Sequence, residues 1–181
     1  TARLVQDIDG ALAHDIAQVP HGSAAIVTLA FRTDRVVRAL DAYGYVTPSA
    51  EGRRVIASTW SSSKWPNRAP EGYVLVRFFL GRAGDDDRAH ASDEALVALA
   101  RFDAASLMGA TGEPELVRID RAIDALPRYL VGHRERAAAL EARVAATPGL
   151  GLAGAYLRGV GMPDTIASAA RAVDAAIRTG T

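Results

Sequence analysis

The sequence predicts a mixed α and β fold in which several strands are antiparallel. Short apolar runs rich in β-branched residues, such as residues 24–31 and 73–81, are typical of buried strands. Other segments place apolar residues at every third or fourth position, the spacing of an amphipathic helix. Residues 43–47 and 55–60 indicate two further strands joined by a turn, an arrangement that favours an antiparallel pair.

The first half of the chain predicts one helix followed by four strands. The helix ends before Pro20 and Gly22, and its apolar positions are Val5, Ile8, Leu12 and Ile16. Residues 34–41 are ambiguous. A turn around Pro48, Glu51 and Gly52 separates the second and third strands, and a loop at 61–72 leads into the fourth.

The second half begins with a helix that has two candidate starts, one in the acidic run 85–87 and one at Ser92. Its expected buried stripe is Leu96, Leu99 and Phe102, and it should stop between Gly109 and Gly112. A strand at 115–119 and an irregular stretch carrying Pro127 and Tyr129 follow. The next helix spans 133–146, ends at Pro148, and faces inward with Ala137, Leu140 and Val144.

The end of the chain predicts a strand, a glycine-rich turn and a closing helix. The strand covers residues 150–153 and the turn covers 154–161. The helix has Pro163 near its first turn, and one face carries Ile166, Ala170, Val173 and Ile177.

Composition excludes several classes of function. The chain has 181 residues, the length of one ordinary domain or two small ones, and its 21 Lys and Arg balance 21 Asp and Glu. Zero net charge argues against a nucleic-acid partner, because binding to nucleic acid depends on neutralising phosphates. The absence of cysteine excludes disulfides and thiol catalysis. The four histidines lack metal-ligand spacing, which argues against a metal site; they are His14, His21, His90 and His133.

The glycine-rich turn is the strongest candidate for a ligand site. Gly154, Gly159 and Gly161 let backbone N–H groups approach a ligand, and the dipole of the following helix favours electron-rich atoms there. The same glycines could serve only the conformation of the turn. The GxGxxG dinucleotide fingerprint is absent here.

Two long segments carry a family resemblance. SSSKWPNRAPEGYVLVRFFLG (61–81) and ALPRYLVGHRERAAALEARVAATPGLGLAGAYLRGVGMPDTIAS (125–168) resemble the C-terminal part of bacterial protoporphyrinogen oxidases. These are FAD-dependent enzymes of haem biosynthesis within the amine-oxidase-like superfamily. The resemblance extends over the whole chain, because the earlier helix, the strand at 24–31 and the GYVTP segment at 44–48 follow in the family's order.

The resemblance implies two partial domains of a longer flavoenzyme. Residues 1–110 would belong to the antiparallel sheet and helices of a substrate-covering domain, and 111–181 would complete a Rossmann-type FAD-binding domain. Its implied FAD-binding residues are Gly154, Ala155, Gly159, Val160, Gly161, Met162 and Ile166. The Rossmann fingerprint is not in the sequence, and the first residue is Thr, so we expect a C-terminal portion that needs a missing N-terminal half.

Substrate contacts and departures from the family also follow from the resemblance. Lys64 and Arg68 could bind the propionates of a porphyrinogen, although solvated charges on a braced surface loop fit the same residues. The family's aromatic residue after an arginine is Ala122 here, following Arg121, and its glutamine is Arg128. These changes leave the aromatic wall of the flavin in doubt. Tyr129 could touch the cofactor or be an ordinary buried tyrosine.

The implied function is oxidation of protoporphyrinogen IX or coproporphyrinogen III by FAD, with oxygen as the final acceptor. The alternative is a non-catalytic domain that binds a porphyrin or a partner. Another amine-oxidase-like flavoenzyme, such as a phytoene desaturase or a monoamine oxidase, fits the loop at 62–70 less well. The sequence itself identifies no catalytic residue. We expect a cytoplasmic location with or without peripheral membrane contact, and apolar edges that could support a homodimer.

Overall fold

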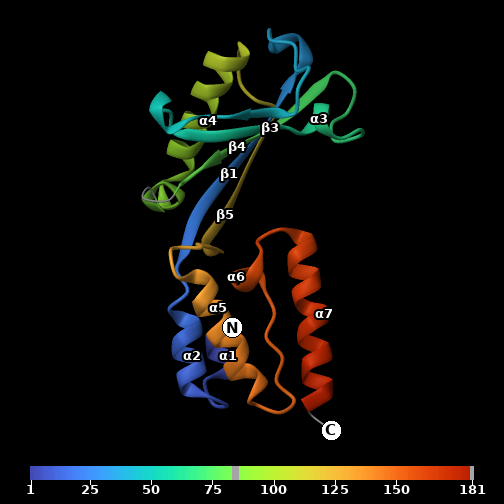
Figure 1. Cartoon of the computed structure of the whole chain (residues 1–181). Helices are drawn as coiled ribbons and strands as arrows, with labels where there is room; N and C mark the ends of the chain where they lie inside the picture. Colours follow the sequence, from blue (N-terminus) through green and yellow to red (C-terminus); the bar gives the residue numbers. More distant parts are fainter. Residues whose placement is uncertain (83–85, 180–181) are drawn as a thin grey trace. The chain divides into compact units, whose positions relative to one another are not determined.

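The computed structural model describes residues 1–82 and 86–179 and confirms the mixed α and β class (Figure 1). The chain divides into two compact units. We call Gly22–Leu126 the sheet unit, and we call Thr1–His21 with Pro127–Thr181 the helical unit. These borders differ from the expected one at 110/111, because the strand after that border belongs to the sheet. Which functional domain each unit represents stays a prediction.

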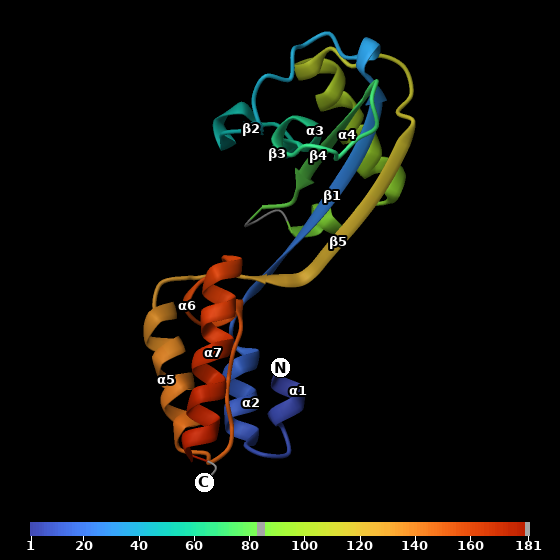
Figure 2. The same ribbon diagram turned by 90° about the vertical axis from the view of Figure 1, so that its right-hand side faces the viewer.

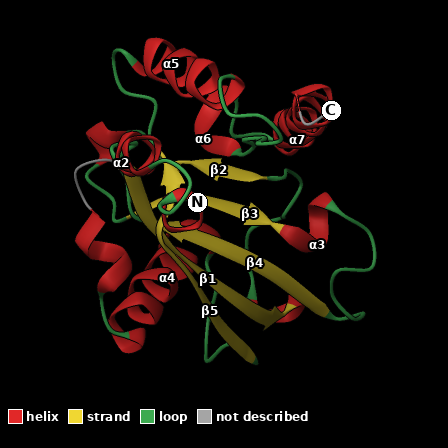
Figure 3. Cartoon of the chain, turned by 90° about the horizontal axis from the view of Figure 1, so that it is seen from below, coloured by secondary structure: helices red, strands yellow, loops and turns green. Residues whose placement is uncertain are grey.

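One five-stranded sheet forms the sheet unit, in the order β2-β3-β4-β1-β5 (Figure 3). Antiparallel pairing joins β1 to β4, β4 to β3 and β3 to β2, and Ala25 lies opposite Leu80. The long strands β1 and β5 run side by side (Figure 2). The strands are β1 (His21–Arg32), β2 (Gly44–Val46), β3 (Val55–Trp60), β4 (Tyr73–Leu80) and β5 (Leu116–Pro127).

Helix α4 (Asp93–Met108) covers one face of this sheet. The side chain of Ser92 caps its first turn, and Gly109 ends it in the left-handed conformation (φ 63°), so the second candidate start and the expected stop are confirmed. The buried stripe follows a spacing of four and consists of Leu96, Ala100, Ala104 and Met108. Phe102 was expected in this stripe, but it falls on the opposite face and is 67 % exposed.

The helical unit contains α1 (Ala2–Val5), α2 (Gly10–Ala17), α5 (His133–Ala145), α6 (Ala155–Arg158) and α7 (Met162–Thr179). Its apolar core joins α2 to α5 and α6 through residues such as Leu12, Ile16, Leu140 and Leu157. The single N-terminal helix of the prediction is wrong. Asp9 accepts hydrogen bonds from the backbone of Ala11 and Leu12 and starts a new helix, which leaves Ile8 exposed.

Short helical turns occupy the expected turn and loop at η2 (Ser49–Glu51) and α3 (Ser61–Lys64). Two more are η1 (Thr33–Arg35), at the start of the ambiguous segment, and η3 (Asp86–His90), at the first candidate helix start. Asp85, in the first candidate helix start, lies outside the described residues. The strand expected at 115–119 continues to Pro127 and removes the irregular stretch before Tyr129. Pairing with the long strand β1 extends it, although most of its side chains are exposed and give no alternating apolar pattern.

Two expectations at the end of the chain, the strand at 150–153 and the buried apolar face of the last helix, are wrong. Residues 150–153 form no strand, because a strand needs a neighbouring strand for its hydrogen bonds and none of the described strands pairs with them. Helix α7 packs through its small residues, with Ser168 its buried position. Its expected apolar stripe instead faces solvent, and Ile166, Val173 and Ile177 are exposed.

Candidate functional site

The glycine-rich turn of the helical unit contains a short helix, α6, between two glycine-lined corners. Gly154 has a φ of 147°, a conformation that side chains rarely adopt, and a Cβ there would lie 2.7 Å from the ring of Tyr156. Its backbone N–H donates to Ser168 Oγ on α7, at 3.2 Å. Glycine at 154 is therefore required by the local fold, whether or not a ligand binds.

The second corner lies at the start of α7. A Cβ on Gly159 would lie 2.5 Å from the side chain of Asp164, so this carboxylate occupies the space that the missing side chain leaves. The backbone and hydroxyl of Thr165 both donate to the carbonyl of Gly161, each at 3.0 Å. Asp164 thus packs against the backbone of this corner in the first turn of α7, consistent with its interpretation as a helix-start residue.

Several residues expected to meet the cofactor leave their side chains open to solvent at this corner. Val160, Met162 and Ile166 are exposed, Met162 by 80 %. Ala155 instead lies at the first corner, where its carbonyl accepts a hydrogen bond from another segment. The structure therefore places the expected residues on one continuous turn from Gly154 into the first turns of α7. Contact with a cofactor stays a prediction.

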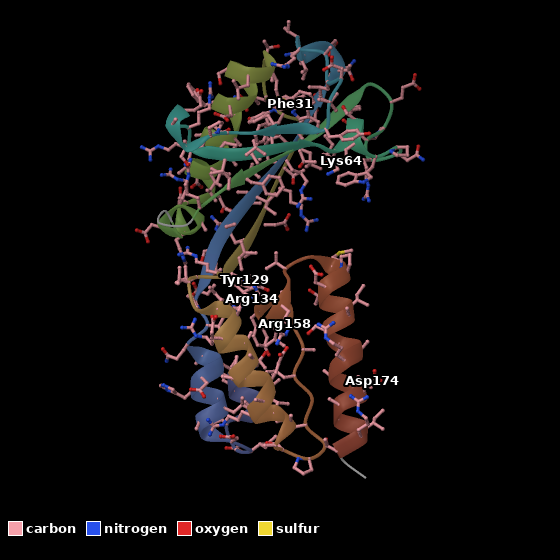
Figure 4. The ribbon with its side chains drawn as sticks, viewed as in Figure 1. Phe31, Lys64, Tyr129, Arg134, Arg158 and Asp174 are labelled. Carbon is pink, nitrogen blue, oxygen red and sulfur yellow. The ribbon has the colours of Figure 1, made fainter. Side chains whose placement is uncertain are left out.

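Two stacked rings hold α6 in place. The rings of Tyr129 and His133 lie 3.8 Å apart at an angle of 12° (Figure 4 labels Tyr129). The Tyr129 hydroxyl donates to the carbonyl of Ala155, and Nε2 of His133 donates to the carbonyl of Leu157 at 2.9 Å. His133 is buried, and its role in holding α6 was not predicted from the sequence, where it was one of four scattered histidines. We call Tyr129 and His133 the ring pair.

A cavity of about 280 Å³ lies next to this turn, between α5, residues 150–152 and α7. At the edge of the cavity, the guanidinium of Arg158 donates hydrogen bonds to the carboxylate of Glu141, with Nε to Oε1 at 2.7 Å. This hydrogen bonding lowers the pKa of Glu141. Gly151 allows the extended segment to touch α7, because a Cβ there would lie 2.5 Å from the carbonyl oxygen of Ala172. Neither the ion pair nor the role of Gly151 was expected from the sequence.

The sheet unit carries the two residues expected to contact substrate. The ammonium of Lys64 lies 4.7 Å from the centre of the Trp65 ring, and the guanidinium of Arg68 lies 5.7 Å from it. This segment is tied to β4 because the backbone N–H of Leu75 donates to Ser62 Oγ. The structure thus brings the two cations together over one indole, with Trp65 39 % exposed.

Arg121, which precedes the departure at Ala122, has a clear structural partner set. Its guanidinium donates to the carbonyls of Ala89 and Ala91 and forms an ion pair with Asp93, at 2.6 Å. It therefore fixes the segment that leads into α4. The consequence of Ala122 for a flavin stays a prediction.

A buried polar network lies between β2, η2 and α4, and sequence reasoning did not identify it. Asp103 is 3 % exposed; it accepts from Arg53 Nη1 at 3.0 Å and from the Tyr45 hydroxyl at 3.1 Å. Burial, together with the neighbouring Asp103 carboxylate, raises the pKa of Tyr45 far above its usual range. A buried carboxylate on an otherwise apolar helix stripe is the signal that could have indicated the network.

The raised pKa of Tyr45 predicts a loss of stability in alkali. Above pH 10 the unfolded chain releases this proton while the folded chain keeps it, so the free energy of unfolding falls as pH rises. The slope contributed by a single such group rises through pH 10 toward a limit of about 1.4 kcal/mol per pH unit. Urea titrations between pH 9 and 11 measure the slope, and Tyr45→Phe should reduce it. An unchanged slope in Tyr45→Phe contradicts the prediction; Tyr43→Phe, at an exposed position, is the control.

Comparison with known proteins defines the class. The chain belongs to the family of flavin containing amine oxidoreductases, whose pattern matches residues 4–177. Membership of this family makes a flavin the expected cofactor. No helix within residues 1–82 and 86–179 combines the length and apolar character needed to cross a membrane.

Within this family the chain is similar to porphyrinogen oxidases. It is 36% identical over 156 residues to the coproporphyrinogen III oxidase of Bacillus subtilis, covering 86% of this chain and 33% of that protein. The coproporphyrinogen III oxidase of Propionibacterium freudenreichii is 36% identical over 181 residues, covering 98% of this chain and 33% of that protein. The mitochondrial protoporphyrinogen oxidase of Nicotiana tabacum is 28% identical over 165 residues, covering 90% and 33%.

Solved structures share the fold of this chain. A crystal structure of a proposed protoporphyrinogen oxidase from Exiguobacterium sp. 255-15 superposes with a TM-score of 0.76 at 35% identity, covering 89% of this chain and 36% of that one. Reduced UDP-galactopyranose mutase shares the fold at 13% identity, with a TM-score of 0.65 over 92% of this chain and 35% of the other. The chain spans about a third of the length of the relatives it matches.

Proposed function

We propose that this chain is the C-terminal portion of an FAD-dependent porphyrinogen oxidase of haem biosynthesis. The observation that carries the proposal is similarity over 80 to 98% of the chain to several coproporphyrinogen III oxidases, at 34 to 36% identity. Coproporphyrinogen III is therefore the favoured substrate, and protoporphyrinogen IX is the second candidate. FAD, when bound, would supply the hydride-accepting chemistry of such an oxidation, with oxygen as the final acceptor.

The residues of the glycine-rich turn fit a flavin. At the first corner, Gly154 has no side chain that could block the approach of a ligand to the backbone. At the second corner, the exposed side chains of Val160 and Met162 provide apolar surface. The N-terminus of the 18-residue helix α7 lies at the same corner, where the positive end of the helix dipole would favour electron-rich atoms. We propose that the cofactor contacts are Gly154, Ala155, Gly159, Val160, Gly161, Met162 and Ile166.

We assign the propionate contacts to Lys64 and Arg68. Neither side chain forms an ion pair with an Asp or Glu among the described residues, and their shared position over Trp65 holds both charges near one point. Coproporphyrinogen III carries propionates where protoporphyrinogen IX carries vinyl groups. Cationic residues at this place would therefore favour the more highly charged substrate.

A chimeric enzyme tests the proposed function. The matching third of the Bacillus subtilis coproporphyrinogen III oxidase is replaced by this chain, and the porphyrin product is followed by its fluorescence. We expect bound flavin and oxidation of coproporphyrinogen III in excess of protoporphyrinogen IX. A folded chimera that holds flavin and forms no porphyrin would instead favour the non-catalytic binding domain.

The same chimera tests the substrate contacts. Lys64→Glu with Arg68→Glu should raise KM for coproporphyrinogen III at least tenfold, because two attractive charges become repulsive, and should change KM for protoporphyrinogen IX less. Arg54→Glu, at an exposed position of the same unit, is the control for the reversal of a surface charge. Equal effects on both substrates contradict the assignment.

The dependence on a missing half has its own test. The isolated chain is mixed with FAD, free cofactor is removed, and the flavin absorbance of the protein is measured. We expect no stoichiometric retention, because the sequence lacks the Rossmann fingerprint that holds the ADP part. Tight binding by the isolated chain overturns this part of the proposal. Cytoplasmic location, peripheral membrane contact and a homodimer stay predictions.

A further inference from the structure

A second cavity, of about 280 Å³, lies within the sheet unit at the β2 edge of the sheet. Residues of the 38–48 segment, η2, β3 and the last turn of α4 line it. Its walls are mainly apolar, with Val46, Pro48 and Leu107 among them. Polar and charged groups also reach the cavity: Arg38, Tyr45, Thr47, Glu51, Arg53 and Trp60.

Two hydrogen-bond donors of this lining have no acceptor among the described residues. The indole Nε1 of Trp60 is unpartnered although Trp60 is 3 % exposed, and the hydroxyl of Thr47 is buried and unpartnered as well. An indole N–H can only donate, so its acceptor has to come from outside the described residues. Buried polar groups without partners are rare in folded proteins, so two of them on residues of one cavity indicate a bound water or ligand.

The positive charge at this cavity is also incompletely matched. The guanidinium of Arg38 lies 5.8 Å from the centre of the Trp60 ring and forms no ion pair with a carboxylate of the described residues. The carboxylate of Asp103 is already used by Arg53 and Tyr45. Glu51 contributes one negative charge, and because Arg38 and Glu51 are both exposed, solvent screens both charges.

We propose that this cavity binds a small organic carboxylate. Its carboxylate group would accept from Trp60 Nε1 and Thr47 Oγ1 and pair with Arg38, which presents a fork of N–H donors suited to carboxylates. Its apolar body would lie against Val46, Pro48 and Leu107. The proposal uses residues of the sheet unit alone and is independent of the proposed flavin and porphyrinogen contacts.

The indole signals of the chain give a direct test. The sequence has two tryptophans, so a ¹H–¹⁵N spectrum shows two indole cross-peaks, and Trp65→Phe assigns the remaining one to Trp60. Benzoate is titrated into the labelled chain, with benzyl alcohol as the uncharged probe of the same shape and chloride as the ionic control. We expect benzoate to shift the Trp60 cross-peak saturably, while the two controls do not.

Variants separate a built site from a water-filled hollow. Arg38→Gln should weaken benzoate binding at least tenfold, whereas Arg54→Gln, which removes a nearby exposed charge outside this lining, should leave it unchanged. Thr47→Val gives a second variant if Arg38→Gln disturbs the fold, which a general loss of dispersion in the spectrum would reveal. No shift of the Trp60 cross-peak means that water alone fills the cavity, and an equal shift with benzyl alcohol means apolar adsorption; either result overturns the proposal.

Discussion

Replacing Asp103 with alanine should lower the free energy of unfolding of the sheet unit by about 3 kcal/mol. The substitution leaves the guanidinium of Arg53 and the hydroxyl of Tyr45 without their shared acceptor in a largely buried place. Removing one partner of a buried ion pair is strongly destabilising, because the remaining charge stays desolvated and uncompensated. Both tryptophans lie in the sheet unit, so urea titrations followed by tryptophan fluorescence report on this unit.

Two further variants divide this effect between its partners. Tyr45→Phe removes one hydrogen bond and should cost about 1 kcal/mol. Asp103→Asn keeps the shape and an acceptor oxygen but removes the charge, so its cost should fall between the other two. If Asp103→Ala is no more destabilising than Tyr45→Phe, the carboxylate does not compensate Arg53 as the structure indicates.

The sheet was largely predictable from the sequence, because strands β1, β3 and β4 combine β-branched residues with a buried face. Residues 116–127 lack such a pattern, and only pairing with β1 makes the whole segment a strand. The opposite error occurred at 150–153, where the local pattern favours a strand that has no partner among the described strands. Local sequence encodes the tendency to extend, whereas the partner strand decides whether extension becomes a sheet.

The candidate site shows the same limit. The glycines at 154, 159 and 161 indicated a tight turn correctly, because glycine adopts backbone conformations that other residues rarely adopt. The contacts that fix this turn join residues far apart in sequence, as Ser168 with Gly154 and His133 with Leu157 do. One unaligned sequence gives no signal for such pairs. The three members of the network at Asp103 also lie far apart in sequence, so its one sequence signal is the carboxylate among the apolar positions of the α4 segment.

His133→Ala should destabilise the helical unit by about 2 to 3 kcal/mol. The substitution leaves a cavity beneath Tyr129 and removes the donor to the Leu157 carbonyl, whose residue is buried in the core of this unit. The unit contains no tryptophan, so hydrogen–deuterium exchange of peptides from α5 and α6 provides a local measurement. Exchange should accelerate in these peptides and stay unchanged in α4, and His14→Ala, at an exposed position, should change neither.

His133→Phe distinguishes the two contributions of the imidazole. A phenyl ring preserves stacking with Tyr129 but cannot donate to Leu157, so the expected cost is about 1 to 2 kcal/mol. Because the ring pair holds both ends of α6, we expect the chimeric enzyme with His133→Phe to keep its fold and to bind flavin more weakly. Tyr129→Phe keeps the stacked rings and loses only the hydrogen bond to Ala155, so it should also weaken flavin binding, but by a smaller factor. If exchange in α6 rises in both variants while flavin affinity does not change, the ring pair stabilises the turn without positioning it for the cofactor.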